Sequence, residues 1–491
     1  MRIKAGIILA GILAVVTLMV TCRHDAEMSS DSDTPVSKEF VYLNHHDTVG
    51  YVGINTCRQC HSDIHKTFVH TGMGSSFGAA DTTKSIAEIH SASVLYDEQL
   101  DLSYKPFWKG DSLYVLEFRT ENRDTIYKNR KRIDYVVGSG QHTNSHMYWQ
   151  NGYLFQAPFT WYSQQGTLDL PPGFEGGHNQ RFGRTIGLEC TSCHNAMPLK
   201  FVLGSENKYG EVPGAIDCER CHGPGELHIK RIQQGIVVDT SVQRDPSIVN
   251  PRKLTTDLQF DLCQRCHLQG NAVLKPGKDF FDFRPGMKLS DVMDIYLPKY
   301  SNAEDQFIMA SHVDRLKQSK CYLNSEGFNC ISCHNPHVSV RETRIEKFNI
   351  TCQNCHQGVP KHECTQTESK LKAAGYNCVS CHMPPSGSID IPHVTVHDHY
   401  IRKPQAKREQ SGEQQFVGLF AINNPHPDNQ SKARGYLQQY ERHKPDPQYL
   451  DSAYYFLNQN NAFEDWPLWV YFYFLANDFE ALSEYVKYIG E

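Results

Sequence analysis

One short pattern recurs seven times in this chain of 491 residues and constrains its fold more than any other feature. Fourteen of the 17 cysteines form pairs separated by two residues, and a histidine directly follows the second cysteine of every pair. From the Cys and His frequencies, roughly 0.03 copies are expected by chance. The seven motifs are Cys57/Cys60/His61, Cys190/Cys193/His194, Cys218/Cys221/His222, Cys263/Cys266/His267, Cys330/Cys333/His334, Cys352/Cys355/His356 and Cys378/Cys381/His382.

This pattern is the attachment signature of c-type haem. Two thiols three positions apart can form thioethers to the vinyl groups of one haem, and the adjacent histidine supplies the proximal nitrogen to iron. Zinc ribbons also pair cysteines in this way, but they do not require a histidine after every second cysteine. A thioredoxin-type redox pair would occur once. We therefore expect seven covalently bound c-type haems, one in each motif.

The composition agrees with a chain that packs on cofactors. Counted over the residue set used for average globular domains, the apolar share is roughly 41%, below the usual 45–50%. Seven haems would add large apolar surfaces that compensate for this deficit. The net charge of −6 argues against a nucleic-acid-binding protein, and 11% aromatic residues argue against disorder.

The N-terminus has the pattern of a targeting segment over residues 1–22. Arg2 and Lys4 precede a 16-residue apolar run, which is shorter than the roughly 20 residues that span a bilayer. Cys22 follows the run directly and resembles a lipoprotein acceptor, although Met19 and Thr21 depart from the usual residues; an uncleaved anchor and simple secretion are the alternatives. We expect an exported protein in the periplasm or at the cell surface, anchored through lipidated Cys22. Residues 23–50 are polar and are predicted to form a tether.

Two further cysteines, Cys321 and Cys364, lie outside the motifs. They flank the motifs that begin at residues 330 and 352, one on each side. An oxidising compartment permits a disulfide between them, and two buried free thiols are the alternative. A direct role for either thiol at a haem iron is the least favoured interpretation.

The spacing of the motifs suggests how the chain is divided. Residues 51–80 hold the first motif, and 186–405 are predicted to form a six-haem module. The interval 81–185 alternates polar and apolar residues, and Asn151-Gly152 is typical of a two-residue hairpin turn, so it is predicted to form a small antiparallel β insertion. Because the intervals between the other motifs are short, we expect a mainly α and irregular fold packed on haems.

The last segment, 406–491, contains no cysteine and has helical periodicity. Four helices are predicted over 431–443, 448–460, 466–476 and 479–489. They look like two tetratricopeptide-type pairs, which are too few to stand alone and should dock on the haem module. An ordinary C-terminal helical cap is the alternative.

The remaining 18 histidines and 10 methionines could supply sixth ligands to the irons. His337 follows proximal His334 by three residues, too few to reach the opposite face of the same haem, so it would bind a neighbouring haem. The same reasoning favours His228, which follows the turn Gly223-Pro224-Gly225. Other candidates are His70, His142, His146, His312, His393, His397 and His399. Those in the tether or the C-terminal helices are discounted, namely His24, His45, His46, His426 and His443.

Several local patterns resemble the multihaem cytochrome c superfamily. They are the Tyr-Val-Gly at 51–53 before the first motif, the His-Thr-Gly-Met at 70–73, Cys-His-Gly-Pro-Gly-x-x-His at 221–228, Cys-His-Asn-Pro-His at 333–337 and Cys-His-Met-Pro at 381–384. The superfamily includes the tetrahaem cytochrome of hydroxylamine oxidation, cytochrome c nitrite reductase, hydroxylamine oxidoreductase and octahaem tetrathionate reductase. Residues 398–404, before the helical tail, are similar to multihaem proteins with tetratricopeptide repeats. The resemblance implies bis-His haems with ligands at His70, His228, His337 and His399.

The chain also departs from these relatives. Cytochrome c nitrite reductase typically carries a Cys-x-x-Cys-Lys motif at its active site, and none of the seven motifs here ends in Lys. Hydroxylamine oxidoreductase and tetrathionate reductase are octahaem, whereas this chain has seven motifs. The resemblance therefore does not transfer an enzymatic activity.

Three functional hypotheses follow. The first is an exported heptahaem cytochrome that carries electrons along closely packed bis-His haems to membrane-associated redox partner proteins. The second is a multihaem reductase or oxidase that acts on a small nitrogen or sulfur oxyanion at one open haem, with His393, His397 or Arg402 as possible residues above the iron. The third refines the first, with the C-terminal helices docking a partner complex.

Overall fold

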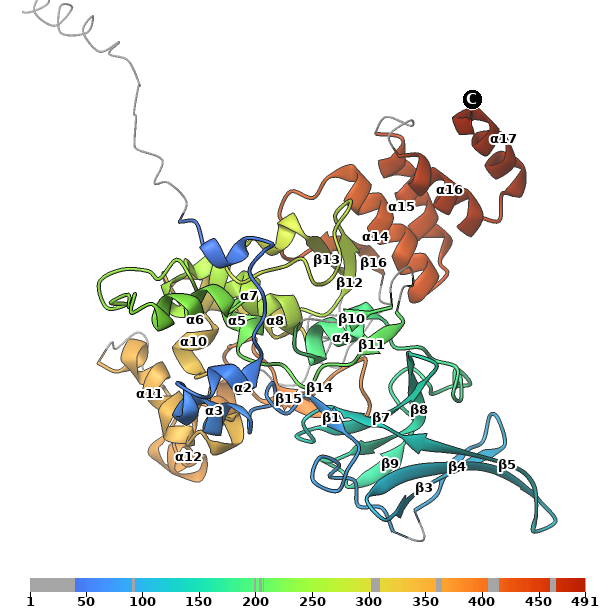
Figure 1. Cartoon of the computed structure of the whole chain (residues 1–491), viewed down its shortest axis with the longest axis horizontal. Coiled ribbons are helices and arrows are strands. Elements are labelled where there is room, and N and C mark those ends of the chain that lie inside the picture. Colours follow the sequence, from blue (N-terminus) through green and yellow to red (C-terminus); the bar gives the residue numbers. More distant parts are fainter. Residues whose placement is uncertain are drawn as a thin grey trace, which may run out of the picture. The chain divides into compact units, whose positions relative to one another are not determined.

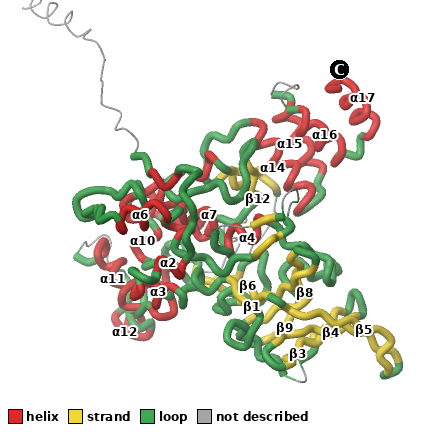
Figure 2. Tube along the Cα trace, in the orientation of Figure 1, coloured by secondary structure: helices red, strands yellow, loops and turns green. Residues whose placement is uncertain are grey.

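The computed structural model describes residues 40–90, 93–197, 200–202, 205, 207–301, 310–358, 364–404, 415–459 and 465–490. The targeting segment, Cys22 and most of the tether lie outside these residues. About one-third of the structure is helix and 22% is strand, arranged in several antiparallel sheets (Figures 1 and 2). The prediction of a mainly α and irregular fold is therefore wrong. Strands occur both between the first two motifs and among the later ones, where the short intervals suggested loops.

Two sheets occupy the interval between the first and second motifs. The five-stranded sheet has the order β1-β6-β7-β8-β9, with β1 (Phe77–Ala79), β6 (Tyr135–Val137), β7 (Thr143–Gln150), β8 (Tyr153–Tyr162) and β9 (Thr167–Asp169). The four-stranded sheet has the order β2-β3-β4-β5, with β2 (Leu95–Asp97), β3 (Leu102–Lys109), β4 (Ser112–Glu121) and β5 (Asp124–Ile133).

Alternation along the strands builds the core between these sheets. Leu113 and Val115 of β4 are fully buried and pack in one cluster with Ala157 and Phe159 of β8. β7 and β8 pair across Asn151-Gly152, where both residues have positive φ, as a two-residue hairpin turn requires. Side-chain packing therefore holds the two sheets together, and no residue of this cluster belongs to a motif.

A third sheet joins the C-terminal helices to the region between the motifs. Its order is β12-β13-β16, and α14 packs on it: Gly435 lies against the ring of Tyr296, where an added Cβ would come within 3.2 Å. The C-terminal segment thus shares a core with strands from the middle of the chain. The elements are β12 (Asn271–Leu274), β13 (Met293–Tyr300), β16 (Phe416–Ala421), α14 (Asn429–Arg442), α15 (Pro447–Leu457), α16 (Trp466–Leu475) and α17 (Phe479–Gly490).

Short helices contain most of the motif residues, although the first of these helices ends at Cys57, and Cys60 and His61 follow it. Residues i, i+3 and i+4 share one face of a helix, so the two thiols and the imidazole of a motif project together. The motif helices are α2 (Ile54–Cys57), α4 (Leu188–His194), α5 (Glu219–His222), α7 (Thr256–His267), α10 (Cys330–Cys333), α11 (Ile345–His356) and α13 (Cys378–His382).

The remaining elements connect the motif helices and are short. They are α3 (Ser62–Phe68), α6 (Glu226–Gln233), α8 (His312–Lys317), α9 (Lys320–Leu323), α12 (Glu368–Ala373), β10 (Lys200–Phe201), β11 (Tyr209–Glu211), β14 (Pro385–Gly387), β15 (Thr395–His397) and the 3-10 turns η1 (Leu43–His45), η2 (Pro251–Lys253), η3 (Leu289–Asp291) and η4 (Val340–Glu342). Among the described residues, no helix combines the length and apolar character needed to cross a membrane.

Candidate functional site

All seven motifs open onto one cavity. Its lining includes the 14 motif cysteines and the seven motif histidines, and its volume is about 3690 Å³. Divided equally, this volume gives each motif about 530 Å³, within the roughly 300–1,000 Å³ of a single cofactor site. The average volume per motif is therefore that of one cofactor site.

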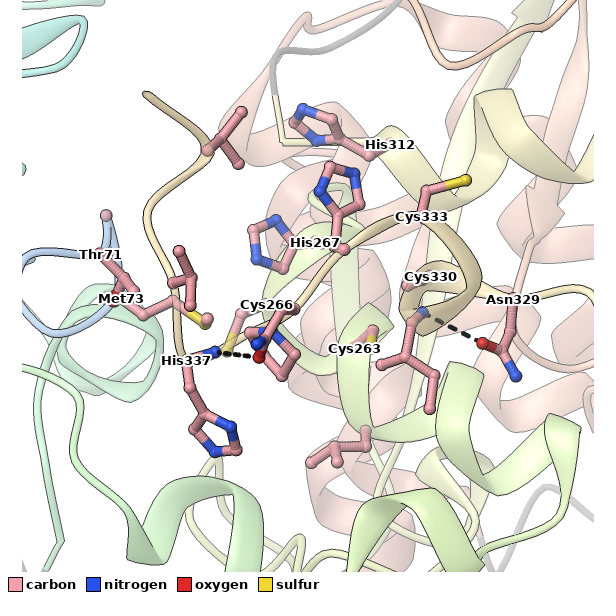
Figure 3. Close-up of a pocket in the computed structure, with 18 of the residues that line it drawn as sticks. Thr71, Met73, Cys263, Cys266, His267, His312, Asn329, Cys330, Cys333 and His337 are labelled. Carbon is pink, nitrogen blue, oxygen red and sulfur yellow. Dashed lines mark hydrogen bonds between the residues drawn. The ribbon is translucent and has the colours of Figure 1, made fainter. Parts of the chain in front are cut away.

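Asparagine caps fix the start of two motif helices. The Asn329 side chain accepts a hydrogen bond of 3.0 Å from the backbone N–H of Ile331, at the start of α10 (Figure 3). The Asn377 side chain accepts from Val379 and Ser380 at the start of α13. Such caps satisfy backbone donors that a helix of only one turn cannot satisfy itself.

Seven histidines outside the motifs also line the cavity, one for each motif histidine. They come from distant parts of the chain, from α3 near the first motif to β15 and the residues just after it. They are His65, His142, His228, His312, His337, His397 and His399.

Two of these histidines face motif histidines across the cavity. The rings of His222 and His337 are nearly parallel, with centroids 6.1 Å apart and an interplanar angle of 8°. The centroids of His334 and His399 are also 6.1 Å apart, at 30°. With metal–nitrogen bonds of about 2.0 Å and each centroid about 1.2 Å behind its nitrogen, two imidazoles on one iron have centroids about 6.4 Å apart. The centroid distances of both pairs are close to this value.

A third pair adjoins the second. The ring centroids of His267 and His312 lie 5.7 Å apart, at 88° (Figure 3). His312 also contacts His399, with centroids 4.7 Å apart. The two non-motif histidines are therefore neighbours, although each of them faces a different motif.

Hydrogen bonds fix the tautomer of several cavity histidines. A backbone carbonyl can only accept, so a ring Nδ1 beside one must carry the proton, which leaves Nε2 free to bind a metal. The bonds run from His222 to Val249 O (2.8 Å), from His382 to Arg402 O (2.9 Å), from His397 to Met383 O (2.6 Å) and from His399 to His397 O (2.9 Å). His228 Nδ1 lies 3.3 Å from Asp245 Oδ2 but forms no hydrogen bond with it.

Burial keeps four of the non-motif imidazoles of the cavity neutral by lowering their pKa. It lowers the pKa of His312 well below its usual value, and the neighbouring His399 contributes in the same direction. Burial, reinforced by His334, lowers the pKa of His399 to about 4. Burial also lowers the pKa of His142 and of His337. A neutral imidazole retains the lone pair that a metal ligand requires.

Other histidines named from the sequence lie outside the cavity lining. His70 is exposed just beyond α3, whereas His65, one turn inside that helix, lines the cavity. His146 is buried in β7, where its ring stacks on Phe159 at 4.2 Å. His393 Nε2 lies 2.6 Å from Asp169 Oδ2. His65 is not among the ligands predicted from the sequence. It follows His61 by four residues, and this spacing could have indicated that the two side chains lie on one side of the chain.

Contacts between motifs define an order along the cavity; each motif is named here by its first cysteine. The thiols of Cys57 and Cys218 interact, as do those of Cys263 and Cys330 and those of Cys352 and Cys378. Helix contacts connect α7 with α10, α10 with α11, and α11 with α13. Motifs 263, 330, 352 and 378 are thus consecutive neighbours, and motif 57 adjoins motif 218.

Two further contacts complete this order. Cys221 lies near enough to Cys263 to influence it electrostatically, which connects motif 218 with motif 263. The thiols of Cys193 and Cys266 interact, and α4 contacts α7, so motif 190 lies beside motif 263. The motifs therefore follow a line of six, with motif 190 as a side branch.

A buried carboxylate connects the first two members of this line. Glu219 accepts hydrogen bonds from the backbone N–H of Val52 (2.9 Å), Gly53 (2.7 Å) and Gly225 (2.8 Å). Val52 and Gly53 directly precede α2, whereas Glu219 lies inside motif 218. A single side chain thus joins two motifs separated by more than 150 residues.

The two extra cysteines lie on the cavity wall without being joined. Cys321 and Cys364 both line the cavity and form no disulfide in the structure. Burial raises the pKa of Cys321, with a smaller contribution from Cys355 of motif 352.

Comparisons with known proteins give one curated relative and two solved structures. Over 182 residues the chain is 26% identical to "Multiheme cytochrome MtrA" of Shewanella baltica (strain OS185), covering 34% of this chain and 51% of that protein. The chain thus spans about half the length of this curated relative. No protein-family model matches.

The two solved structures are similar at low identity. The outer cell wall cytochrome OcwA matches with a TM-score of 0.44 and 18% identity, covering 72% of this chain and 79% of that one. The undecaheme cytochrome from the S-layer of Carboxydothermus ferrireducens matches with a TM-score of 0.35 and 14% identity, covering 90% and 70%. Over about a third of its length, the chain is thus similar to a multihaem cytochrome, and its seven Cys-x-x-Cys-His motifs line one cavity.

Proposed function

We propose that the protein is an exported heptahaem cytochrome that carries electrons along bis-His haems. One observation carries this proposal: seven motif histidines and seven further histidines line the same cavity. Three motif histidines lie close to a non-motif histidine, at ring-centroid distances of 5.7–6.1 Å, which supports the proposal. When bound, each haem supplies one iron that alternates between the ferric and ferrous states.

The seven further histidines of the cavity would supply each haem with a second imidazole, which would leave no iron position for a substrate. His337 is assigned to the haem of motif 218, His399 to that of motif 330 and His312 to that of motif 263. Burial keeps all three imidazoles neutral by lowering their pKa, and a hydrogen bond to the carbonyl oxygen of His397 orients His399. Haems with two imidazole ligands each would favour electron exchange over substrate chemistry, because no iron position would remain for a substrate.

The order of the motifs supports a linear path for electrons through the molecule. Electrons would pass along motifs 57, 218, 263, 330, 352 and 378, with motif 190 as a branch at motif 263. The contact between His312 and His399 connects two assigned ligands of neighbouring haems. The two ends of the line are the expected exchange points for redox partner proteins.

Export and anchoring form a separate part of the proposal. Residues 1–22 have the pattern of a targeting segment, and Cys22 is the proposed lipid-bearing residue, which would place the partners at a membrane. Mass spectrometry of the mature N-terminus tests this. A diacylated Cys22 is expected, and an unmodified N-terminus downstream of Cys22 would contradict it.

The haem count and coordination are tested on the purified full chain. Intact-mass analysis is expected to show seven haem additions, each abolished by replacing the two cysteines of one motif. Electron paramagnetic resonance of the oxidised protein is expected to show low-spin haems. A high-spin ferric signal that changes on addition of nitrite or hydroxylamine would instead favour the reductase hypothesis.

A further inference from the structure

A buried ion pair lies between the segments that carry two assigned ligands. Arg315 of α8 donates from Nε to Asp398 Oδ1 (2.9 Å) and from its terminal nitrogen to Asp398 Oδ2 (2.7 Å). The side chains are 2% and 6% exposed. The Arg315 guanidinium also lies 5.2 Å from the centroid of the Tyr400 ring. This two-pronged geometry restricts both position and orientation.

Each partner of the ion pair is close in sequence to one ligand. Arg315 follows His312 by three residues, which is about one turn of α8, and Asp398 directly precedes His399. A displacement of either charged group would therefore be transmitted to an imidazole in the cavity. The pair joins two segments that are more than 80 residues apart in the chain.

A buried serine reinforces the same junction. Ser319, just after α8, donates to the carbonyl oxygen of His399 (3.0 Å) and accepts from the backbone N–H of Ile401 (2.8 Å). Ser319 is completely buried. Side-chain and backbone bonds thus fix the 398–401 segment against the end of α8.

Stability is a weak reason for such a pair. Removing two charges from water costs about as much as their attraction returns, so an apolar pair of similar volume would often serve equally well. A fixed fork, in contrast, specifies geometry. We propose that Arg315 and Asp398 form a positioning pair that sets His312 and His399 together, and with them the sixth ligands of the haems of motifs 263 and 330. This inference rests on the proposed bis-His function.

The positioning pair has a specific consequence for the two haems. The ligand rings touch, with centroids 4.7 Å apart, and they face His267 and His334 respectively. Loosening the pair should change both haems at once and leave the other five unchanged. A role confined to folding would not select two particular haems.

The test uses the haem-loaded full chain and three variants: D398N, R315K and S319A. Low-temperature electron paramagnetic resonance and a potentiometric titration followed by visible absorption are the readouts. The matched control is E117Q. It breaks the comparable two-pronged contact from Arg181 within the β region, and neither residue lines the cavity.

D398N is expected to alter the low-spin signals and potentials of two haems, and R315K to alter the same two to a smaller extent. E117Q is expected to lower thermal stability with all seven haem signals unchanged. Wild-type spectra in all three test variants would overturn the positioning role, as would equal changes in E117Q. If D398N does not accumulate, R315K and S319A decide the result.

If the proposed bis-His function itself is wrong, the spectra of the wild-type protein will show it. If wild-type protein itself shows five-coordinate haems at motifs 263 and 330, the bis-His assignment fails before any variant is compared. If wild type is low-spin throughout and the three variants are unchanged, only the positioning role fails.

Discussion

Individual histidines carry most of the functional argument, and His337 is the clearest case. Its position three residues after His334 indicates from sequence alone that it belongs to another haem. The structure places its ring opposite His222, nearly parallel to it. The spacing excludes the haem of His334 as a partner of His337. Only the folded chain indicates the haem of His222 instead.

Replacing His337 by alanine tests this assignment. The variant H337A removes one imidazole from the haem of motif 218, so one haem in seven is expected to become high-spin and to bind carbon monoxide when reduced. Difference absorption spectroscopy measures this. H426A is the control, because His426 is exposed and lies outside the cavity lining; a carbon monoxide adduct in H426A, or none in H337A, would contradict the assignment.

His65 and His70 compete for a role near the first motif. The sequence resemblance favours His70, whereas in the structure His65 lines the cavity and His70 is exposed. H65A is therefore expected to yield one high-spin haem, and H70A to keep the wild-type spectrum. The same electron paramagnetic resonance measurement on both variants decides between them, and a high-spin haem in H70A alone would reverse the assignment.

At the residue scale, the sequence predicts those functional groups that lie close together along the chain. Cysteine spacing identifies each proposed attachment site, because the two thiols and the histidine lie within five residues. The proposed sixth ligands come from distant segments, so His312 and His399 could be named as candidates but not paired. His146 shows the opposite case, since only the two-sheet core explains why it is buried away from the cavity.

At the scale of elements, the β region depends on a charged contact inside its core. Glu117 of β4 faces inward beside Leu113 and Val115, and Arg181 and Tyr127 donate to its carboxylate. Burial would raise the pKa of Glu117, but these bonds outweigh it and hold the pKa below the usual 4.5. A carboxylate with a lowered pKa stabilises the fold at neutral pH.

That contact predicts both a mutational and a pH effect. E117Q is expected to reduce the free energy of unfolding by about 1–2 kcal/mol, because Arg181 is partly exposed and its contribution is screened. The stabilisation is present above pH 4.5 and is lost as the pH falls through the lower pKa of the folded state. Thermal melts of wild type and E117Q between pH 3 and 7 check this: the difference should shrink toward acid, and a constant difference would contradict it.

The secondary structure was harder to predict than the motifs. The hairpin at Asn151-Gly152 could be identified because its turn residues are specific. Strands β13 and β16 could not, because they pair with each other over more than 100 residues. The helical periodicity of the last segment predicted the C-terminal helices. No local sequence pattern predicted the sheet on which α14 packs.

At the scale of the whole molecule, Glu219 holds motif 57 to motif 218. E219Q keeps the shape of the side chain but replaces a carboxylate that accepts three backbone N–H groups, so the segment 50–57 is expected to loosen by about 1–3 kcal/mol. Hydrogen-exchange mass spectrometry should show faster exchange in that segment. Exposed Glu480 supplies the control variant E480Q, and unchanged exchange in E219Q would count against this link.

The central claim is a path of seven six-coordinate haems around one cavity. The most direct measurement is quantitative electron paramagnetic resonance of the fully oxidised, full-length protein, with the haem content determined on the same sample. Seven haems per chain with all ferric spins low-spin is the predicted result. A high-spin signal that integrates to one or more haems per chain would contradict it.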